Sequence, residues 1–122
     1  MFLILFVLHD NDNLDRILLA WEETGVKGIT IIPSTGLGRI RTSALREDLP
    51  LIPRLEDLLC HTENLNRTIF TIVEDEEIID KIVSVTEQIV GDLYEPDTGI
   101  LAVLPLTRVY GIKQRQHLNP KN

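Results

Sequence analysis

A glycine-rich segment followed by arginines is the part of this sequence best suited to bind a ligand. The string Thr35-Gly36-Leu37-Gly38-Arg39 follows an apolar run directly, and Arg41 and Arg46 come before the next acid. Glycine lets the backbone approach a ligand and point N–H groups at an anion, and arginine adds a fork that fits phosphate. The segment is therefore a candidate anion site, with a tight turn or a solvated loop as the alternative.

A second glycine-bounded segment, residues 91–99, precedes another apolar run. It could form the other half of a cleft, or it could be a solvated turn. Arg108 follows that apolar run. Its guanidinium could contact a phosphate, or it could pair with an acid at a contact between subunits.

No set of residues suggests catalysis, so we expect a binding protein and not an enzyme. Cys60 and His61 are neighbours in sequence, which is rarely the arrangement of a nucleophile and its base. One cysteine and three scattered histidines also make a metal site within one chain improbable. The paired acids Glu76 and Glu77 fit the first turn of a helix, where negative charge is favourable.

Length and composition predict one small domain with its own core. The chain has 122 residues, of which 43% are hydrophobic, and we expect a single domain over residues 1–113 with a tail at 114–122. The net charge of −7 argues against binding to nucleic acid. The apolar start, Met1 to Leu8, lacks a preceding basic segment and is too short to span a bilayer. It predicts a buried strand in a cytoplasmic protein.

The apolar pattern alternates between strands and helices in the first half of the chain. Residues 2–8 predict a strand, and Asn11, Asp12 or Asn13 can cap a helix that follows. Gly25 is placed to end this helix. Residues 29–32 predict a second strand, closed by Pro33.

The same order recurs in the second half of the chain. Residues 67–73 predict a strand, Asp75 can cap a second helix with an apolar stripe, and residues 100–104 predict the last strand. The order βαββαβ predicts an α+β, ferredoxin-like fold, with a four-stranded antiparallel sheet and two helices on one face. Pro33 and Pro105 lie at the ends of the strands that this fold places at the sheet edges.

Two features go beyond a simple ferredoxin-like monomer. The strand 2–8 is apolar on both faces, whereas two helices cover one face only, so we expect a second copy of the chain to cover the other. The connection from Ser34 to Asn66 is far longer than a hairpin needs and predicts an arm that binds a partner. The arm residues that we assign to partner binding are Arg41, Arg46, Leu51, Ile52 and Arg54.

Together these features resemble the PII nitrogen-regulatory signalling proteins. The resemblance covers about residues 1–113 and is carried by the βαββαβ order, the long loop at about 35–65, Gly36-Leu37-Gly38-Arg39, Asp75 and the last strand with its Arg108-Val109 pair. It implies a homotrimer that binds adenine nucleotides (ATP, ADP or AMP), and in many members 2-oxoglutarate, between subunits. The loop would contact a transporter or an enzyme. The implied ligand-binding residues are Gly36, Leu37, Gly38, Arg39, Gly99 and Arg108.

The sequence departs from the family pattern at its phosphate-binding positions. The family usually has Gly-Lys before the last strand, where this chain has Thr98-Gly99 and no lysine. Gly111 stands at a second basic position, and the loop contains no tyrosine. We therefore expect altered or lost ATP binding, or an effector with fewer phosphates. A ligand-free interaction trimer and a small ferredoxin-like enzyme are the alternatives.

Overall fold

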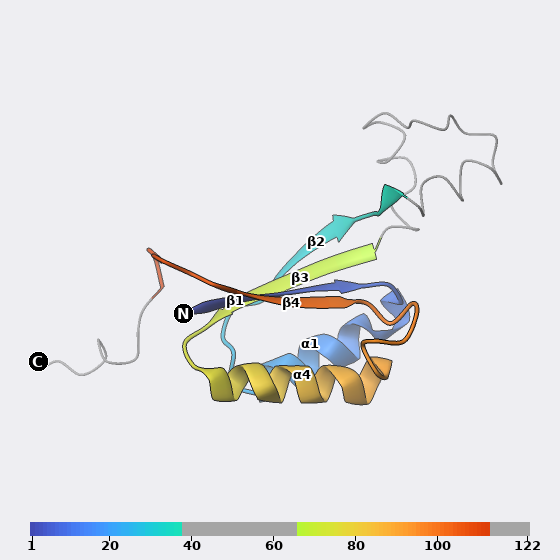
Figure 1. The fold of residues 1–122 in the computed structure, drawn as a ribbon, viewed down its shortest axis with the longest axis horizontal. Coiled ribbons are helices and arrows are strands. Elements are labelled where there is room, and N and C mark those ends of the chain that lie inside the picture. Colours follow the sequence, from blue (N-terminus) through green and yellow to red (C-terminus); the bar gives the residue numbers. More distant parts are fainter. Residues whose placement is uncertain (38–65, 113–122) are drawn as a thin grey trace, which may run out of the picture.

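The structure, a computed structural model, describes residues 1–37 and 66–112 and forms a four-stranded antiparallel sheet with both helices on one face (Figure 1). The strand order is β2-β3-β1-β4. The elements are β1 (Phe2–Leu8), the 3₁₀ turn η1 (Asn11–Asn13), α1 (Leu14–Glu23), β2 (Thr30–Ser34), β3 (Asn66–Val73), α4 (Glu76–Val90) and β4 (Ile100–Pro105). The predicted α+β, ferredoxin-like fold is confirmed.

The two prolines lie on edge strands as expected, and Pro105 ends its strand, whereas Pro33 lies one residue before the end of its strand. Pro33 sits within β2, opposite Arg67 of β3, and Pro105 is the last residue of β4, opposite Phe2. A proline has no backbone N–H to donate to a neighbouring strand. On one side of an edge strand there is no neighbouring strand, so a proline that faces that side removes no hydrogen bond from the sheet. The edge positions therefore tolerate both prolines inside the ladder.

The first helix begins differently from its sequence prediction. The side chain that caps the helical segment belongs to Asp10, whose carboxylate accepts the backbone N–H of Asp12 at 3.0 Å and so starts the 3₁₀ turn. Asn13 is the N-cap of α1 by position, but it makes no capping hydrogen bond with its side chain. Gly25, at a φ of +108°, follows the end of α1 as predicted.

The second helix begins as predicted. The Asp75 carboxylate accepts the backbone N–H of Ile78 at 3.1 Å, and Glu76 and Glu77 occupy the first turn. Gly91 caps the C-terminal end at a φ of +94°. Each cap satisfies backbone groups that the helix itself leaves without partners.

The core lies between the sheet and the two helices. The alternate residues Ile4, Phe6 and Leu8 of β1 are fully buried there. The Trp21 indole N–H on α1 donates to the Thr86 hydroxyl on α4 at 2.9 Å, and that hydroxyl donates to the carbonyl of Ile82 at 2.6 Å. This buried chain of hydrogen bonds fixes the two helices relative to each other without leaving the indole N–H unsatisfied.

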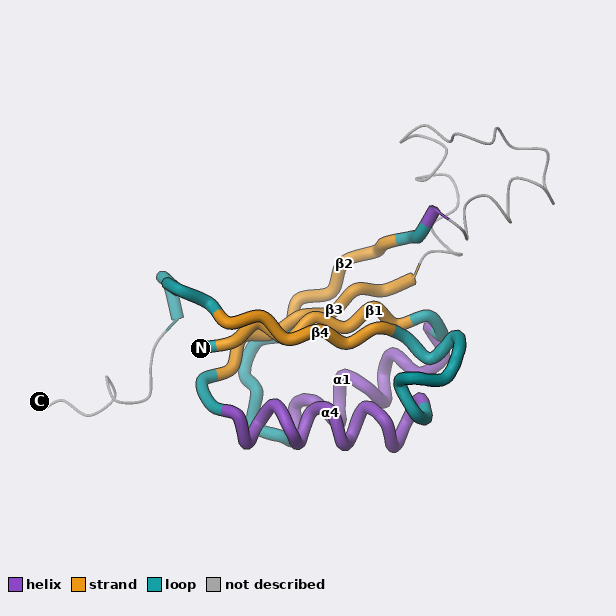
Figure 2. Tube along the Cα trace, viewed as in Figure 1, coloured by secondary structure: helices purple, strands orange, loops and turns teal. Residues whose placement is uncertain are grey.

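The opposite face of the sheet is apolar as well, and no described helix covers it (Figure 2). Pairing in the sheet places residues of four strands on this face, which we call the helix-free face. It comprises Leu3, Leu5 and Val7 of β1, Thr68, Phe70 and Ile72 of β3, Ile100, Ala102 and Leu104 of β4, and Thr30 and Ile32 of β2. None of these residues carries a charge. The expectation that β1 is apolar on both faces is confirmed.

Among residues 1–37 and 66–112, neither helix combines the length and the hydropathy needed to cross a membrane.

Candidate functional site

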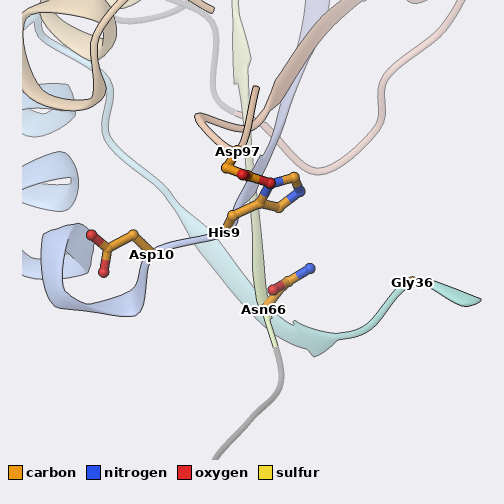
Figure 3. Close-up of a pocket in the computed structure, with 5 residues that line it drawn as sticks. All are labelled: His9, Asp10, Gly36, Asn66 and Asp97. Carbon is orange, nitrogen blue, oxygen red and sulfur yellow. The ribbon is translucent and has the colours of Figure 1, made fainter. Parts of the chain in front are cut away.

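A hollow of about 550 Å³ lies at one end of the sheet, lined by His9, Asp10, Gly36, Asn66 and Asp97 (Figure 3). Strand directions explain why these distant residues meet. Both β1 and β2 are antiparallel to β3, so the ends of β1 and β2 lie beside the start of β3. The start of β4 reaches the same end because Ile100 pairs with Val7.

The acidic side chains at the hollow have different roles. The Asp10 carboxylate points toward the adjacent helical turn, where it accepts the Asp12 N–H and lies 3.4 Å from the side-chain nitrogen of Asn13 (Figure 3). Asp97 comes from the turn before β4 and is exposed, and within residues 1–37 and 66–112 no hydrogen bond or ion pair engages its carboxylate. Asp97 is therefore the carboxylate at this site that remains available to a ligand.

The turn that carries Asp97 is held by hydrogen bonds of its own. These join the N–H of Leu93 to the Glu87 carboxylate at 3.1 Å, the N–H of Tyr94 to the Asp92 carboxylate at 2.9 Å, and the Thr98 hydroxyl to the carbonyl of Glu95 at 3.0 Å. Asp97 itself has a φ of +63°, a left-handed conformation that aspartate tolerates better than most residues. The fold thus fixes the backbone of the turn from which the Asp97 side chain extends.

Gly99, which the sequence assigns to ligand binding, also has a structural role. Its φ is +130°, and a Cβ at this position would lie 2.6 Å from the carbonyl oxygen of Val7 and 2.7 Å from the ring of Phe6. The chain therefore needs glycine here to bring the start of β4 against β1. The ligand role of Gly99 stays a prediction.

The predicted site residues within the described part of the chain lie at both ends of the sheet. Gly36 lines the hollow, and Leu37 follows it with 56% of its surface exposed. Arg108 follows β4 at the opposite end, because Pro105 pairs with Phe2 at the start of β1. The length of β1 separates the two ends by roughly 20 Å at about 3.3 Å per residue. Arg108 and Gly36 cannot share one ligand within a single chain.

Several predicted residues lie outside the described residues. These are Gly38, Arg39, Arg41, Arg46, Leu51, Ile52 and Arg54, together with Cys60, His61 and the tail at 114–122. Within the described part of the chain, no group of three His, Cys, Asp or Glu side chains is arranged to hold a metal ion.

Sequence reasoning did not single out His9, Asn66 or Asp97 as site residues. The available signal was positional. His9 follows the first predicted strand, and Asn66 directly precedes the third, so an antiparallel sheet with this strand order places both at the same end.

We predict that Gly99→Ala destabilises the fold more than Gly91→Ala does. Both glycines have a positive φ, but an added Cβ meets nothing within 4 Å at Gly91, whereas at Gly99 it collides with backbone and the Phe6 ring. Overpacking typically costs about 1–3 kcal/mol, so the free energy of unfolding in urea should fall by that much more for Gly99→Ala. Equal losses for the two variants would contradict the close approach of β4 to β1.

Comparisons with known proteins do not identify a family for the chain. No protein-family model matches it, and no curated protein matches it significantly.

Proposed function

We propose that the chain is a PII-like, trimeric signalling protein of the cytoplasm that binds a small effector and acts on a partner protein through the connection between β2 and β3. The observation that supports this proposal is that the hollow lies beside both stems of the connection, by which we mean the residues where it leaves β2 and enters β3. Gly36, near the end of β2, and Asn66, the first residue of β3, both line it. Residues 38–65 join these two stems.

A ligand in the hollow would therefore contact both attachment points of the connection. A ligand shifts a conformational equilibrium only by binding its states with different affinity. Contacts at both stems supply this difference, because any rearrangement of the connection that moves its stems changes the shape of the ligand site. This is the physical basis for effector-controlled partner binding.

The helix-free face supports assembly from several copies. It is uncharged and mostly apolar across four strands, with Ile32, Ile100 and Leu104 each more than two-fifths exposed. An uncharged, contiguous surface on a chain with a net charge of −7 favours burial against an equally uncharged surface, which a second copy provides. We expect closed cyclic assembly, which buries this face in every copy.

The separation of Gly36 and Arg108 also supports assembly. In one chain they lie at opposite ends of the sheet. A cleft between two copies would bring the Arg108 guanidinium of one toward the Gly36 end of the other, so that the arginine can meet an anion. An adenine nucleotide fits such a cleft, with Arg39 as a further cation for its phosphates. We expect ATP to gain little over AMP or ADP, because Thr98-Gly99 stands where the family has Gly-Lys, so the lysine is absent.

We propose a non-enzymatic role, in which binding itself carries the signal. A ligand-free interaction trimer is the second candidate. It is favoured by the helix-free face, which needs a cover whether or not the hollow is occupied.

We predict a homotrimer in dilute solution, three times the chain mass of 13.9 kDa. Leu5→Lys should yield a folded chain of lower oligomeric state, because Leu5 faces away from the helices and its lysine can reach water once the copies separate. Phe6→Lys should unfold or aggregate, because Phe6 is fully buried in the core and a buried, unpaired charge costs several kcal/mol. Light scattering and circular dichroism check both variants. A wild-type chain that is a stable monomer at micromolar concentration would contradict the assembly.

We predict that Arg39→Ala and Arg108→Ala each weaken nucleotide binding by about 1.5–3 kcal/mol, the range for a hydrogen bond to a charged group. Arg16→Ala is the matched control, since Arg16 is exposed on α1 and donates a hydrogen bond at 3.2 Å to the side chain of Asn13, one turn earlier. Calorimetry with ATP, ADP and AMP measures the effect. Tight ATP binding that neither substitution changes would refute the proposed cleft, and no binding of any nucleotide would favour the ligand-free trimer.

A further inference from the structure

The end of β2 is joined to β3 by a hydrogen bond between two side chains as well as by backbone pairing. The hydroxyl oxygens of Ser34 and Thr68 lie 2.7 Å apart, a distance at which one hydroxyl donates to the other. Ser34 is the last residue of β2 and pairs with Asn66, the first residue of β3. The hydroxyl pair therefore links the two strands at the place where their ladder ends.

This hydroxyl pair lies next to both stems of the connection. Gly36 follows Ser34 by two residues, and Asn66 precedes Thr68 by two. Both stem residues line the hollow. The end of a ladder opens more easily than its middle, because it has paired neighbours on one side only. A side-chain link at this end opposes the opening, and so it limits how far the two stems can separate.

The pair also belongs to the helix-free face. Thr68 lies on that face between Val7 of β1 and Ile32 of β2, its partners in the sheet. The Ser34 side chain reaches Thr68 from the same face, and both residues are partly exposed. Water competes for the two hydroxyls while the face is open, and their bond strengthens once a second copy excludes that water. A hydroxyl that has a partner also costs less to cover than one without.

We infer that the Ser34–Thr68 pair is a clasp through which assembly positions the stems of the connection. This role rests on the proposed function, which takes the helix-free face as the contact between copies. Ser34 and Thr68 act as positioning residues, because they hold Gly36 and Asn66 at the hollow. Covering the face favours the arrangement with closed stems, and by reciprocity separation of the stems weakens the contact between copies.

Amide hydrogen exchange on the full chain, read at Gly36 and Asn66, measures the opening of the stems. Thr68→Val replaces the hydroxyl with a methyl group of similar size, and Thr68→Ser keeps a hydroxyl. Thr30→Val is the matched control. Thr30 is exposed on the same face of β2, and within residues 1–37 and 66–112 no hydrogen bond engages its hydroxyl. Light scattering under the same conditions gives the oligomeric state.

We expect exchange at both stems to rise about two- to tenfold in Thr68→Val, the factor that corresponds to one net hydrogen bond. Ser34→Ala should have the same effect, and the double variant should add little, because either change removes the same bond. Thr68→Ser and Thr30→Val should exchange at the stems as the wild type does. Amides in the middle of α4 should not change in any of these variants.

The oligomeric state should change the size of this effect. In Leu5→Lys, which we expect to separate the copies, Thr68→Val should raise stem exchange by a smaller factor, because water already competes for the hydroxyls. A stable trimer in which Thr68→Val and Thr30→Val exchange alike at the stems keeps the proposed assembly and overturns this inference. Equal factors in assembled and separated chains also overturn it. A wild-type monomer overturns the assembly itself, which light scattering shows, and the link between assembly and the stems with it.

Discussion

The rest of the structure depends on β1, a central strand with apolar side chains on both of its faces. Its alternate residues Ile4, Phe6 and Leu8 are fully buried against the helices. The residues between them, such as Leu5, face the side that no described helix covers. Burying the first set folds the domain, because apolar burial is the main favourable term in folding. The second set leaves an apolar surface that a further copy of the chain is suited to cover.

The same strand pairing that builds the core also builds the candidate site. Because β1 and β2 end beside the start of β3, the backbone brings His9, Gly36 and Asn66 to one hollow. Gly36 and Asn66 are also the stems of the long connection. In the proposed function, ligand binding and the conformation of the connection are linked through these shared residues. The other end of the sheet holds Arg108, so the proposed cleft needs a second copy of the chain to bring this arginine toward Gly36.

The sequence predicted elements and caps well where the signal is local. Asp75 and Gly91 end α4 as their residue types suggest, and the strands follow their apolar runs. The sequence placed element boundaries less accurately where a neighbouring element determines them. Pro33 continues β2 because an edge strand tolerates it, and Asp10 caps the helical segment because a 3₁₀ turn precedes α1. Asp97 was missed because its role depends on the folded turn, and the need for glycine at 99 comes from Phe6, far away in sequence.

The central claim is that occupancy of the hollow controls the connection between β2 and β3. Hydrogen exchange on the full chain, with and without saturating adenine nucleotide, tests it most directly. The account predicts that protection changes at residues 36 and 66 and within residues 38–65, while the amides in the middle of α1 and α4 stay as they were. Ligand binding that changes protection only outside residues 36–66 would contradict the account.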